Sequence, residues 1–238
     1  MSKDGQKRYA GLLTLLIAVA FILAARLIYI FLSDAQRFPI NTIKVAANYH
    51  HISRKQLEEI LSNYTSSSFF TISTSQLKKD LNTLDWTESV DVERIWPDAI
   101  KITVVEKVPV AVWNDALMTA EGGLFSQGKT NQSYNLPRLN GPEQQQKDVL
   151  QIYQKLSKLL AIYGLQAASL ELRENQAWEL ILSNGIQIHL GKRDLEERLQ
   201  RFCKAYPLVF ADKPEQLGGV DLRYARGMAV QWKQQTGR

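Results

Sequence analysis

Cysteine and histidine are scarce in this chain. One cysteine, Cys203, occurs in 238 residues, so no internal disulfide can form and the core must hold the fold. Cys203 occupies an apolar position of a predicted helix, which favours a buried small side chain. The three histidines, His50, His51 and His189, lack the i, i+4 partner, cysteine pair or carboxylate set of a zinc site. We therefore predict no metal site and no cofactor.

Catalytic motifs are also missing. The chain has no nucleophile elbow, phosphate-binding loop or dinucleotide fingerprint, and its pairs Gly122-Gly123 and Gly218-Gly219 fit turns better than phosphate cradles. The adjacent acids Glu58-Glu59 diverge by about 100° on a helix, whereas catalytic carboxylates must converge. A serine–lysine dyad stays open, because these residue types are common and nothing marks one pair. We predict no catalytic residues and no enzyme.

An excess of one charge sign is absent once the N-terminal segment is set aside. The net charge is +5, and residues 1–32 hold four Lys or Arg against one Asp, or +3, which leaves +2 for the other 206 residues. This balance argues against a nucleic-acid partner, which usually faces a domain-wide excess of positive charge. With 45% apolar and 22% charged residues and no low-complexity tract, the remainder should fold.

One long hydrophobic run is present, at residues 11–32. As a helix it reaches roughly 33 Å, enough to cross a bilayer. Arg26 at mid-bilayer depth would cost about 2.5 to 3.5 kcal/mol, but each Leu, Ile, Val or Phe returns about 0.3 to 0.6 kcal/mol, and the arginine stem can reach the headgroups. We predict a transmembrane helix at 11–32, a tail at 1–10 and a juxtamembrane linker at 33–39.

The flanks of this run predict its orientation. Lys3, Lys7 and Arg8 precede it, whereas Arg37 is the only basic residue close after it. Basic flanks stay in the cytoplasm, so the N-terminus is expected there and the C-terminal part across the membrane. Cleavage of a signal peptide at residues 18–20 remains an alternative, although the apolar run continues beyond that site.

The segment after the linker predicts a small α+β domain. A strand at about 40–45 comes first, followed by two helices that begin with capping boxes at 53–56 and 73–76. Alternating residues at 90–104 then predict a hairpin with one wet face. The order β-α-α-β-β gives a three-stranded sheet with two helices on one face.

Pro109 marks the predicted boundary between residues 40–108 and a second domain at 109–238, because proline lacks the hydrogen-bond donor that a central strand needs. The second domain should mix helices with an antiparallel-rich sheet. Its last strand has only six residues after it, which predicts a sheet edge. The predicted elements are a hairpin around 121–123, a helix from about 143 to 163, strands at 170–172, 178–182 and 186–190, a helix capped by Asp194 and ended by Pro207, and strands at 220–224 and 228–232.

Several motifs carry a family resemblance. The stretch RIWPDAIKITVVEKVPVAVW at 94–113 resembles the signature of the FtsQ/DivIB family of bacterial division proteins. Three more stretches agree in order and spacing: LPRLNGPE at 136–143, LGKRD from residue 190, and VDLRYARGMAVQW at 220–232. The resemblance implies that 40–108 is a POTRA domain and that 109–238 is the β domain of the family.

The resemblance also implies a role. Members are non-catalytic, single-pass proteins of the inner membrane with periplasmic domains, and they link divisome proteins at the septum by binding FtsB and FtsL. FtsB is expected to add a strand at the C-terminal edge. The implied partner-binding residues are Arg223, Tyr224, Gly227, Met228, Ala229, Val230, Gln231 and Trp232.

Alternatives remain for these residues and for the whole chain. Ordinary sheet packing would explain Tyr224 and Trp232, and a solvated strand face would explain Arg223. A membrane-anchored periplasmic cell-wall enzyme, or a POTRA-type assembly and docking factor, are the competing functions.

Overall fold

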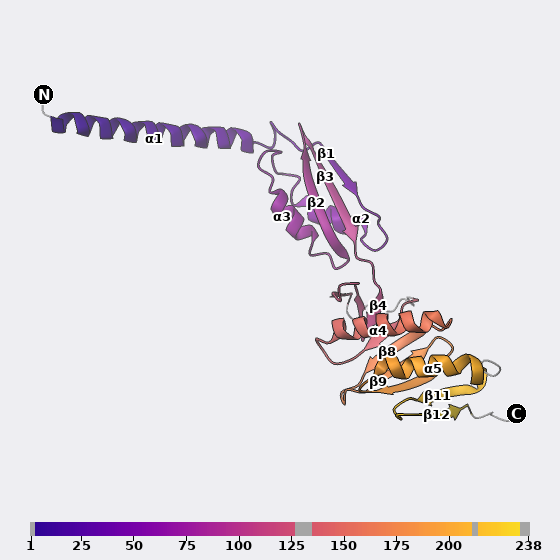
Figure 1. The fold of residues 1–238 in the computed structure, drawn as a ribbon. Helices are drawn as coiled ribbons and strands as arrows, with labels where there is room; N and C mark the ends of the chain where they lie inside the picture. The colour runs from indigo at the N-terminus through magenta and orange to yellow at the C-terminus, as the bar shows by residue number, and fades with distance from the viewer. Residues whose placement is uncertain (1–2, 127–134, 211–213, 234–238) are drawn as a thin grey trace. The chain divides into compact units, whose positions relative to one another are not determined.

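The computed structural model describes residues 3–126, 135–210 and 214–233 (Figure 1). Its contacts divide the chain into two compact units, 1–107 and 108–238. The first unit contains α1 (Lys3–Ser33), β1 (Thr42–Ala46), α2 (Arg54–Ser62), α3 (Thr74–Leu81), β2 (Thr87–Ile95) and β3 (Ala99–Glu106). The second contains β4 (Ala111–Trp113), β5 (Ala116–Met118), β6 (Leu124–Phe125), β7 (Arg138–Asn140), α4 (Gln146–Ile162), β8 (Ala167–Leu172), β9 (Trp178–Leu182), β10 (Gln187–Gly191), α5 (Leu195–Val209), a 3-10 turn (Pro214–Gln216), β11 (Leu217–Asp221) and β12 (Ala229–Trp232).

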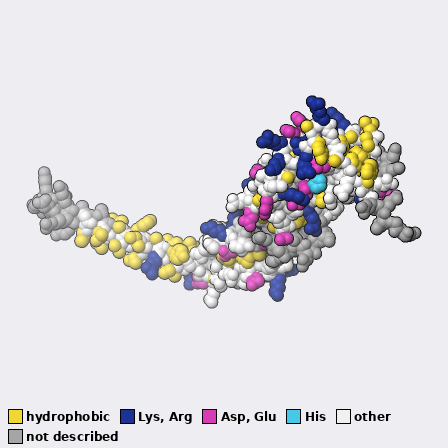
Figure 2. All heavy atoms as spheres, turned by 90° about the horizontal axis from the view of Figure 1, so that it is seen from below, with side chains coloured by type: hydrophobic (Ala, Val, Ile, Leu, Met, Phe, Trp, Pro, Cys, Tyr) yellow, Lys and Arg dark blue, Asp and Glu magenta, His cyan; other side chains and the backbone are white. Residues whose placement is uncertain are grey.

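Helix α1 contains the hydrophobic run. Its segment Gly11–Ser33 has a mean hydropathy of 2.7, and none of that apolar window is buried against the rest of the protein. Hydrophobic side chains cover much of the visible surface of this helix (Figure 2). A helix that is apolar all round and uncovered by protein suits a lipid environment, and its length suffices to cross a bilayer.

The globular part of the first unit is the predicted β-α-α-β-β arrangement. The strand order is β1-β3-β2, with β1 parallel and β2 antiparallel to β3. Helices α2 and α3 bury Leu57, Leu61, Leu77 and Leu81 against one face of this sheet. That face contributes Val90, Ile100, Ile102 and Val104 to the same core.

Helix starts in this unit follow the sequence closely. The Ser53 side chain accepts a hydrogen bond from the N–H of Gln56, and the Gln56 side chain accepts one from the N–H of Ser53, so the predicted capping box forms. Ser73 likewise caps α3 by accepting from the N–H of Gln76. The side chain of Gln76, however, donates to Asp80 instead of returning to the cap, so this second box is only half formed.

The second unit is a nine-stranded sheet covered on one face by α4 and α5 (Figure 1). The strand order is β12-β11-β10-β9-β8-β7-β4-β5-β6. Five of the eight neighbouring pairs are antiparallel, and the pairs β10–β11, β4–β7 and β7–β8 are parallel. Buried residues of the two helices and of alternate strand positions form one core, which includes Leu139, Leu170, Leu180, Ile188 and Phe202.

Two strands differ from the sequence-based expectation. Strand β7 is not among the predicted elements, because Pro137 and Gly141-Pro142 flank its three residues, yet it pairs with β4 and β8 in the middle of the sheet. Strand β11 was expected at 220–224 but lies at Leu217–Asp221. The pair Gly218-Gly219, which we interpreted as a turn, is inside this strand.

Helix α5 departs from its predicted ends. Asp194 has a φ of 57°, in the left-handed region, and its side chain makes no capping hydrogen bond. The helix also continues through Pro207 to Val209. Proline lacks an N–H, so it removes one helical hydrogen bond. The turn that follows still closes, because the N–H of Phe210 donates to the carbonyl of Tyr206 at 3.0 Å, and the helix ends at Val209.

Candidate partner-binding edge

Strand β12 forms one edge of the nine-stranded sheet. It stands at the end of the strand order, and in the part of the chain that the structure describes it pairs with β11 alone (Figure 1). The pairing is antiparallel and places Val230 opposite Val220. An edge strand presents N–H and C=O groups to which an extended segment of another chain can hydrogen-bond.

The direction of the main-chain groups follows from one hydrogen bond. The N–H of Lys233 donates to the carbonyl of Gln216, next to β11, at 2.7 Å. In an antiparallel strand, residues two apart direct their main-chain groups to the same side, and the residues between them face the other side. Val230 and Trp232 therefore direct their N–H and C=O groups away from β11, toward the open edge.

The glycine pair of β11 explains how its neighbours come so close. A Cβ atom added to Gly218 would lie 3.3 Å from the carbonyl oxygen of Gln231, and one added to Gly219 would lie 3.3 Å from that of Gln187. Both distances are tighter than ordinary contacts. The register also shifts between Leu217 and Gly219, as at a β-bulge. The glycines thus let β10 and β12 approach β11 closely.

Side chains of β12 alternate between the two faces of the sheet. Met228, just before the strand, and Val230 pack against the hydrophobic core. The Trp232 ring lies on the same face, with its centroid 6.0 Å from that of the buried Phe210. Trp232 is nevertheless 49% exposed. Packing therefore fixes the strand and leaves half of the indole surface available.

The connection between β11 and β12 is held by Arg201 of α5. Its guanidinium donates to the carbonyls of Leu222 at 3.2 Å, Tyr224 at 2.9 Å and Ala225 at 2.6 Å. Each carbonyl belongs to a residue outside regular strand, where it would otherwise need water. The Tyr224 side chain is 58% exposed beside this anchored backbone. The loop therefore presents a tyrosine from a fixed position.

Arg223 makes a close ion pair with Asp221. Its Nε lies 2.9 Å from both carboxylate oxygens, and Nη2 lies 2.6 Å from Oδ2. These hydrogen bonds lower the pKa of Asp221 below its ordinary value, although partial burial opposes the shift. The side chain of Arg223 is 64% exposed. The expectation of a merely solvated arginine is thus incomplete, because its guanidinium has a fixed anionic partner.

The face of the sheet opposite the helices carries a row of charged side chains. Glu171, Glu179, His189 and Asp221 occupy directly opposed positions on β8 to β11. The His189 Nδ1 lies 2.8 Å from Glu179 Oε1, and Arg173 pairs with the other Glu179 oxygen at 2.5 Å. A cavity of about 240 Å³ lies over this face. Among the described residues, no group of three His, Cys, Asp or Glu is placed to hold a metal.

The structure brings the eight predicted site residues to this one edge. Four of them lie in the connection between β11 and β12, and the other four form β12 itself. Gly227 has open space around the position of an added Cβ, so the fold does not require glycine there. Their role in binding a partner stays a prediction. The residues are Arg223, Tyr224, Gly227 and Met228 in the connection, and Ala229, Val230, Gln231 and Trp232 in the strand.

Comparison with known proteins assigns both units. Residues 38–107 match the family model described as POTRA domain, FtsQ-type, and residues 111–223 match that described as Cell division protein FtsQ/DivIB, C-terminal. The chain is 34% identical over 203 residues to the cell division protein FtsQ of Coxiella burnetii, which covers 85% of this chain and 84% of that protein. The chain belongs to the FtsQ family of cell division proteins.

Other FtsQ proteins give the same result. FtsQ of Shewanella oneidensis is 34% identical over 224 residues, covering 93% of this chain and 84% of that protein. FtsQ of Aliivibrio fischeri is 32% identical over 204 residues, covering 85% and 79%. The resemblance seen in the sequence motifs is therefore confirmed, and so are the POTRA domain and the α+β class.

The FtsQ family match and the candidate edge overlap little. The FtsQ/DivIB C-terminal model ends at residue 223, so only Arg223 of the eight predicted residues lies within it. Sequence reasoning also missed Arg201, which is inside the matched range but belongs to no motif. Its carbonyl partners come 21 to 24 residues later in the chain. No spacing rule links a helical arginine to a loop at that distance.

Proposed function

We propose that this FtsQ family member is a non-enzymatic scaffold of the divisome in the inner membrane. Its tail at 1–10 lies in the cytoplasm, residues 11–32 cross the membrane, and the domains at 40–108 and 109–238 lie in the periplasm at the division septum. The long apolar helix and the basic residues that precede it support this topology. The family assignment supports the role in division.

We further propose that the periplasmic segment of FtsB, together with FtsL, binds at the edge formed by β12. FtsB adds to the sheet as the next strand. The open side of β12 is the observation that carries this proposal, because Val230 and Trp232 direct main-chain groups to it. The exposed rings of Tyr224 and Trp232 beside the edge supply the residue types that dominate interface energetics.

One substitution separates main-chain pairing from side-chain packing. Val230→Pro removes an N–H that points to the open side and leaves the hydrogen bonds to β11 in place, as edge strands tolerate. Val230→Ala trims the side chain but keeps that N–H, so it is the matched control. We expect full-length Val230→Ala, in lipid nanodiscs, to bind an FtsB periplasmic peptide within a few-fold of the wild-type affinity. Val230→Pro should weaken binding at least about ten-fold, or roughly 1.4 kcal/mol.

Isothermal titration calorimetry with the FtsB peptide measures the affinity of each variant, and circular dichroism shows whether each variant is folded. Equal affinity of the proline and alanine variants would exclude strand addition at β12. Absence of saturable binding by the folded wild-type chain would exclude FtsB as the partner.

A further inference from the structure

The end of α1 is packed against the POTRA domain. The hydroxyl of Ser68 donates to the main-chain carbonyl of Leu32, in the last turn of the helix. The ring of Phe38 lies between those of Phe31 and Phe70, with centroids 5.6 Å and 4.9 Å away. The expected linker at 33–39 is therefore a short turn held in place by aromatic packing, and the loop around residue 70 lies level with the end of the apolar span.

The turn between β2 and β3 lies at this same end of the domain. Asn41, which follows the juxtamembrane turn, donates from its N–H to the carbonyl of Asp98 at 3.0 Å and from its side-chain amide to the carboxylate at 2.8 Å. The guanidinium of Arg94 donates to the carbonyl of Ile72, in the loop that packs on α1. Two independent contacts thus tie the β2–β3 turn to the segments that leave the membrane.

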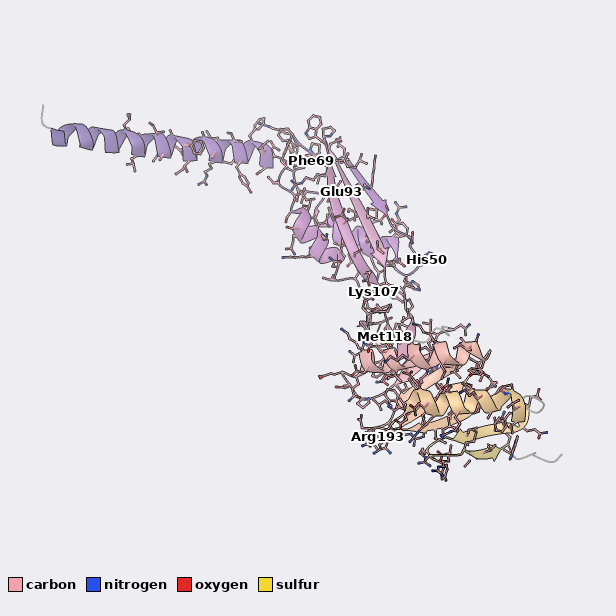
Figure 3. All side chains as sticks on the ribbon, in the orientation of Figure 1. His50, Phe69, Glu93, Lys107, Met118 and Arg193 are labelled. Atoms are coloured by element: carbon pink, nitrogen blue, oxygen red, sulfur yellow. The ribbon has the colours of Figure 1, made fainter. Side chains whose placement is uncertain are left out.

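This end of the domain exposes large apolar side chains. Trp96, at the tip of the turn, is 77% exposed, Phe70 is 39% exposed and Ile95 is 37% exposed. Figure 3 labels Phe69, the neighbour of Phe70, at this end of the sheet, whereas Lys107 lies at the opposite end. An exposed tryptophan beside exposed aliphatic and aromatic groups marks an interaction surface.

We propose that this surface, formed by Phe70, Ile95 and Trp96, lies in the headgroup region of the leaflet from which α1 emerges. The occupant is a lipid surface because the apolar span of α1 ends against the same loop, so lipid is continuous with this end of the domain. Indole rings prefer this interface, where the ring is partly in hydrocarbon and the N–H meets water. Two arginines lie next to this surface in the sequence, but both have protein partners: Arg37 pairs with Asp34 at 3.1 Å, and Arg94 donates to the carbonyl of Ile72. The proposal therefore rests on the apolar side chains.

The inference rests on the membrane span and not on the FtsB proposal. It gives the POTRA domain a fixed side toward the membrane: the β2–β3 turn faces lipid, and the end of the sheet marked by Lys107 faces away from it. The alternative is that a second copy of the chain, or another protein, binds to the same surface.

Tryptophan quenching by lipid tests the proposal in the full chain. The protein has five tryptophans, none of them in α1, so a reconstituted chain reports on its folded domains. Vesicles of phosphatidylcholine and phosphatidylglycerol, brominated near the headgroup end of the acyl chain, serve as the quencher. We expect the lipid-dependent part of the quenching to be lost in Trp96→Phe and retained in Trp232→Phe, which removes a half-exposed tryptophan of the other unit.

The possible outcomes discriminate between lipid and protein as the binding partner of this surface. Undiminished quenching in Trp96→Phe, or an equal loss in both variants, would overturn the proposal. A blue-shifted Trp96 emission that brominated lipid does not quench would show protein on this surface, and would also overturn it. Trp96 is mostly exposed, so its replacement should leave the fold intact. An unchanged circular dichroism spectrum of the variant would confirm this.

Discussion

Arg223 reaches back two residues to hold Asp221, with its Nε 2.9 Å from each carboxylate oxygen. Asp221 also lies opposite Ala229 of the edge strand, so this ion pair adjoins the candidate binding edge. The ion pair holds the Arg223 side chain beside β12, and the Asp221 carboxylate neutralises part of the arginine charge. An acidic group of a partner would therefore meet an oriented guanidinium whose charge is already shared.

The ion pair predicts a pH dependence. Hydrogen bonds from Arg223 lower the pKa of Asp221 below its ordinary 3.8, so the folded state binds this proton more weakly than the unfolded state. The stabilisation is therefore complete above the unfolded pKa and is lost as pH falls through the folded pKa. We expect Arg223→Gln to raise the pKa of Asp221 and to remove that acid-sensitive contribution. Carbon-13 NMR titration of the Asp221 carboxyl measures it, and Lys192→Gln controls for the loss of one positive charge. An unchanged titration in Arg223→Gln would contradict the ion pair.

Glu106, at the end of β3, predicts a loss of stability. Its largely buried carboxylate accepts hydrogen bonds from the N–H groups of Ile52 at 3.0 Å and His51 at 3.1 Å. Burial raises the pKa of Glu106, but these hydrogen bonds outweigh it and the pKa is lowered. Glu106→Ala leaves the donors unsatisfied, which should cost about 1 to 3 kcal/mol of unfolding free energy. Glu106→Gln keeps an acceptor oxygen and should cost less.

Urea unfolding of the full chain in detergent micelles, followed by tryptophan fluorescence, measures both Glu106 variants. Trp86 is a local probe, because its ring stacks on that of His51 with centroids 3.6 Å apart. Wild-type stability of the alanine variant would show that the carboxylate does not support the Ile52 and His51 backbone.

Local signals predicted much of the first unit. The box of Ser53 and Gln56 forms because both partners lie within one helical turn, so the sequence contains the whole interaction. The same rule failed for Asp194, which has a left-handed backbone where Ser53 is extended, and which makes no capping hydrogen bond. Capping depends on the backbone entering the helix as well as on residue type.

Long-range pairing explains the errors in the second unit. Strand β7 has three residues between prolines, too few for a visible alternation, and exists because β4 and β8 provide hydrogen bonds on both sides. Gly218 and Gly219 resembled a turn, yet their small size serves close strand pairing.

Arg201 leads to the last prediction, which concerns the shape of the binding edge. Its three hydrogen bonds to the β11–β12 connection need a planar, forked donor, and a lysine ammonium cannot reproduce that geometry. We expect Arg201→Lys to weaken FtsB peptide binding by about ten-fold, and Arg201→Ala by more, because the loop that carries Tyr224 loses its fixed position. Amide exchange in residues 222–228 should accelerate in both variants while exchange in β8 and β9 stays unchanged. Lys204→Ala is the matched control, since it removes an exposed positive charge from the same helix and lies outside the predicted binding residues. Faster loop exchange with undiminished affinity would show that FtsB does not use the Arg201-anchored conformation.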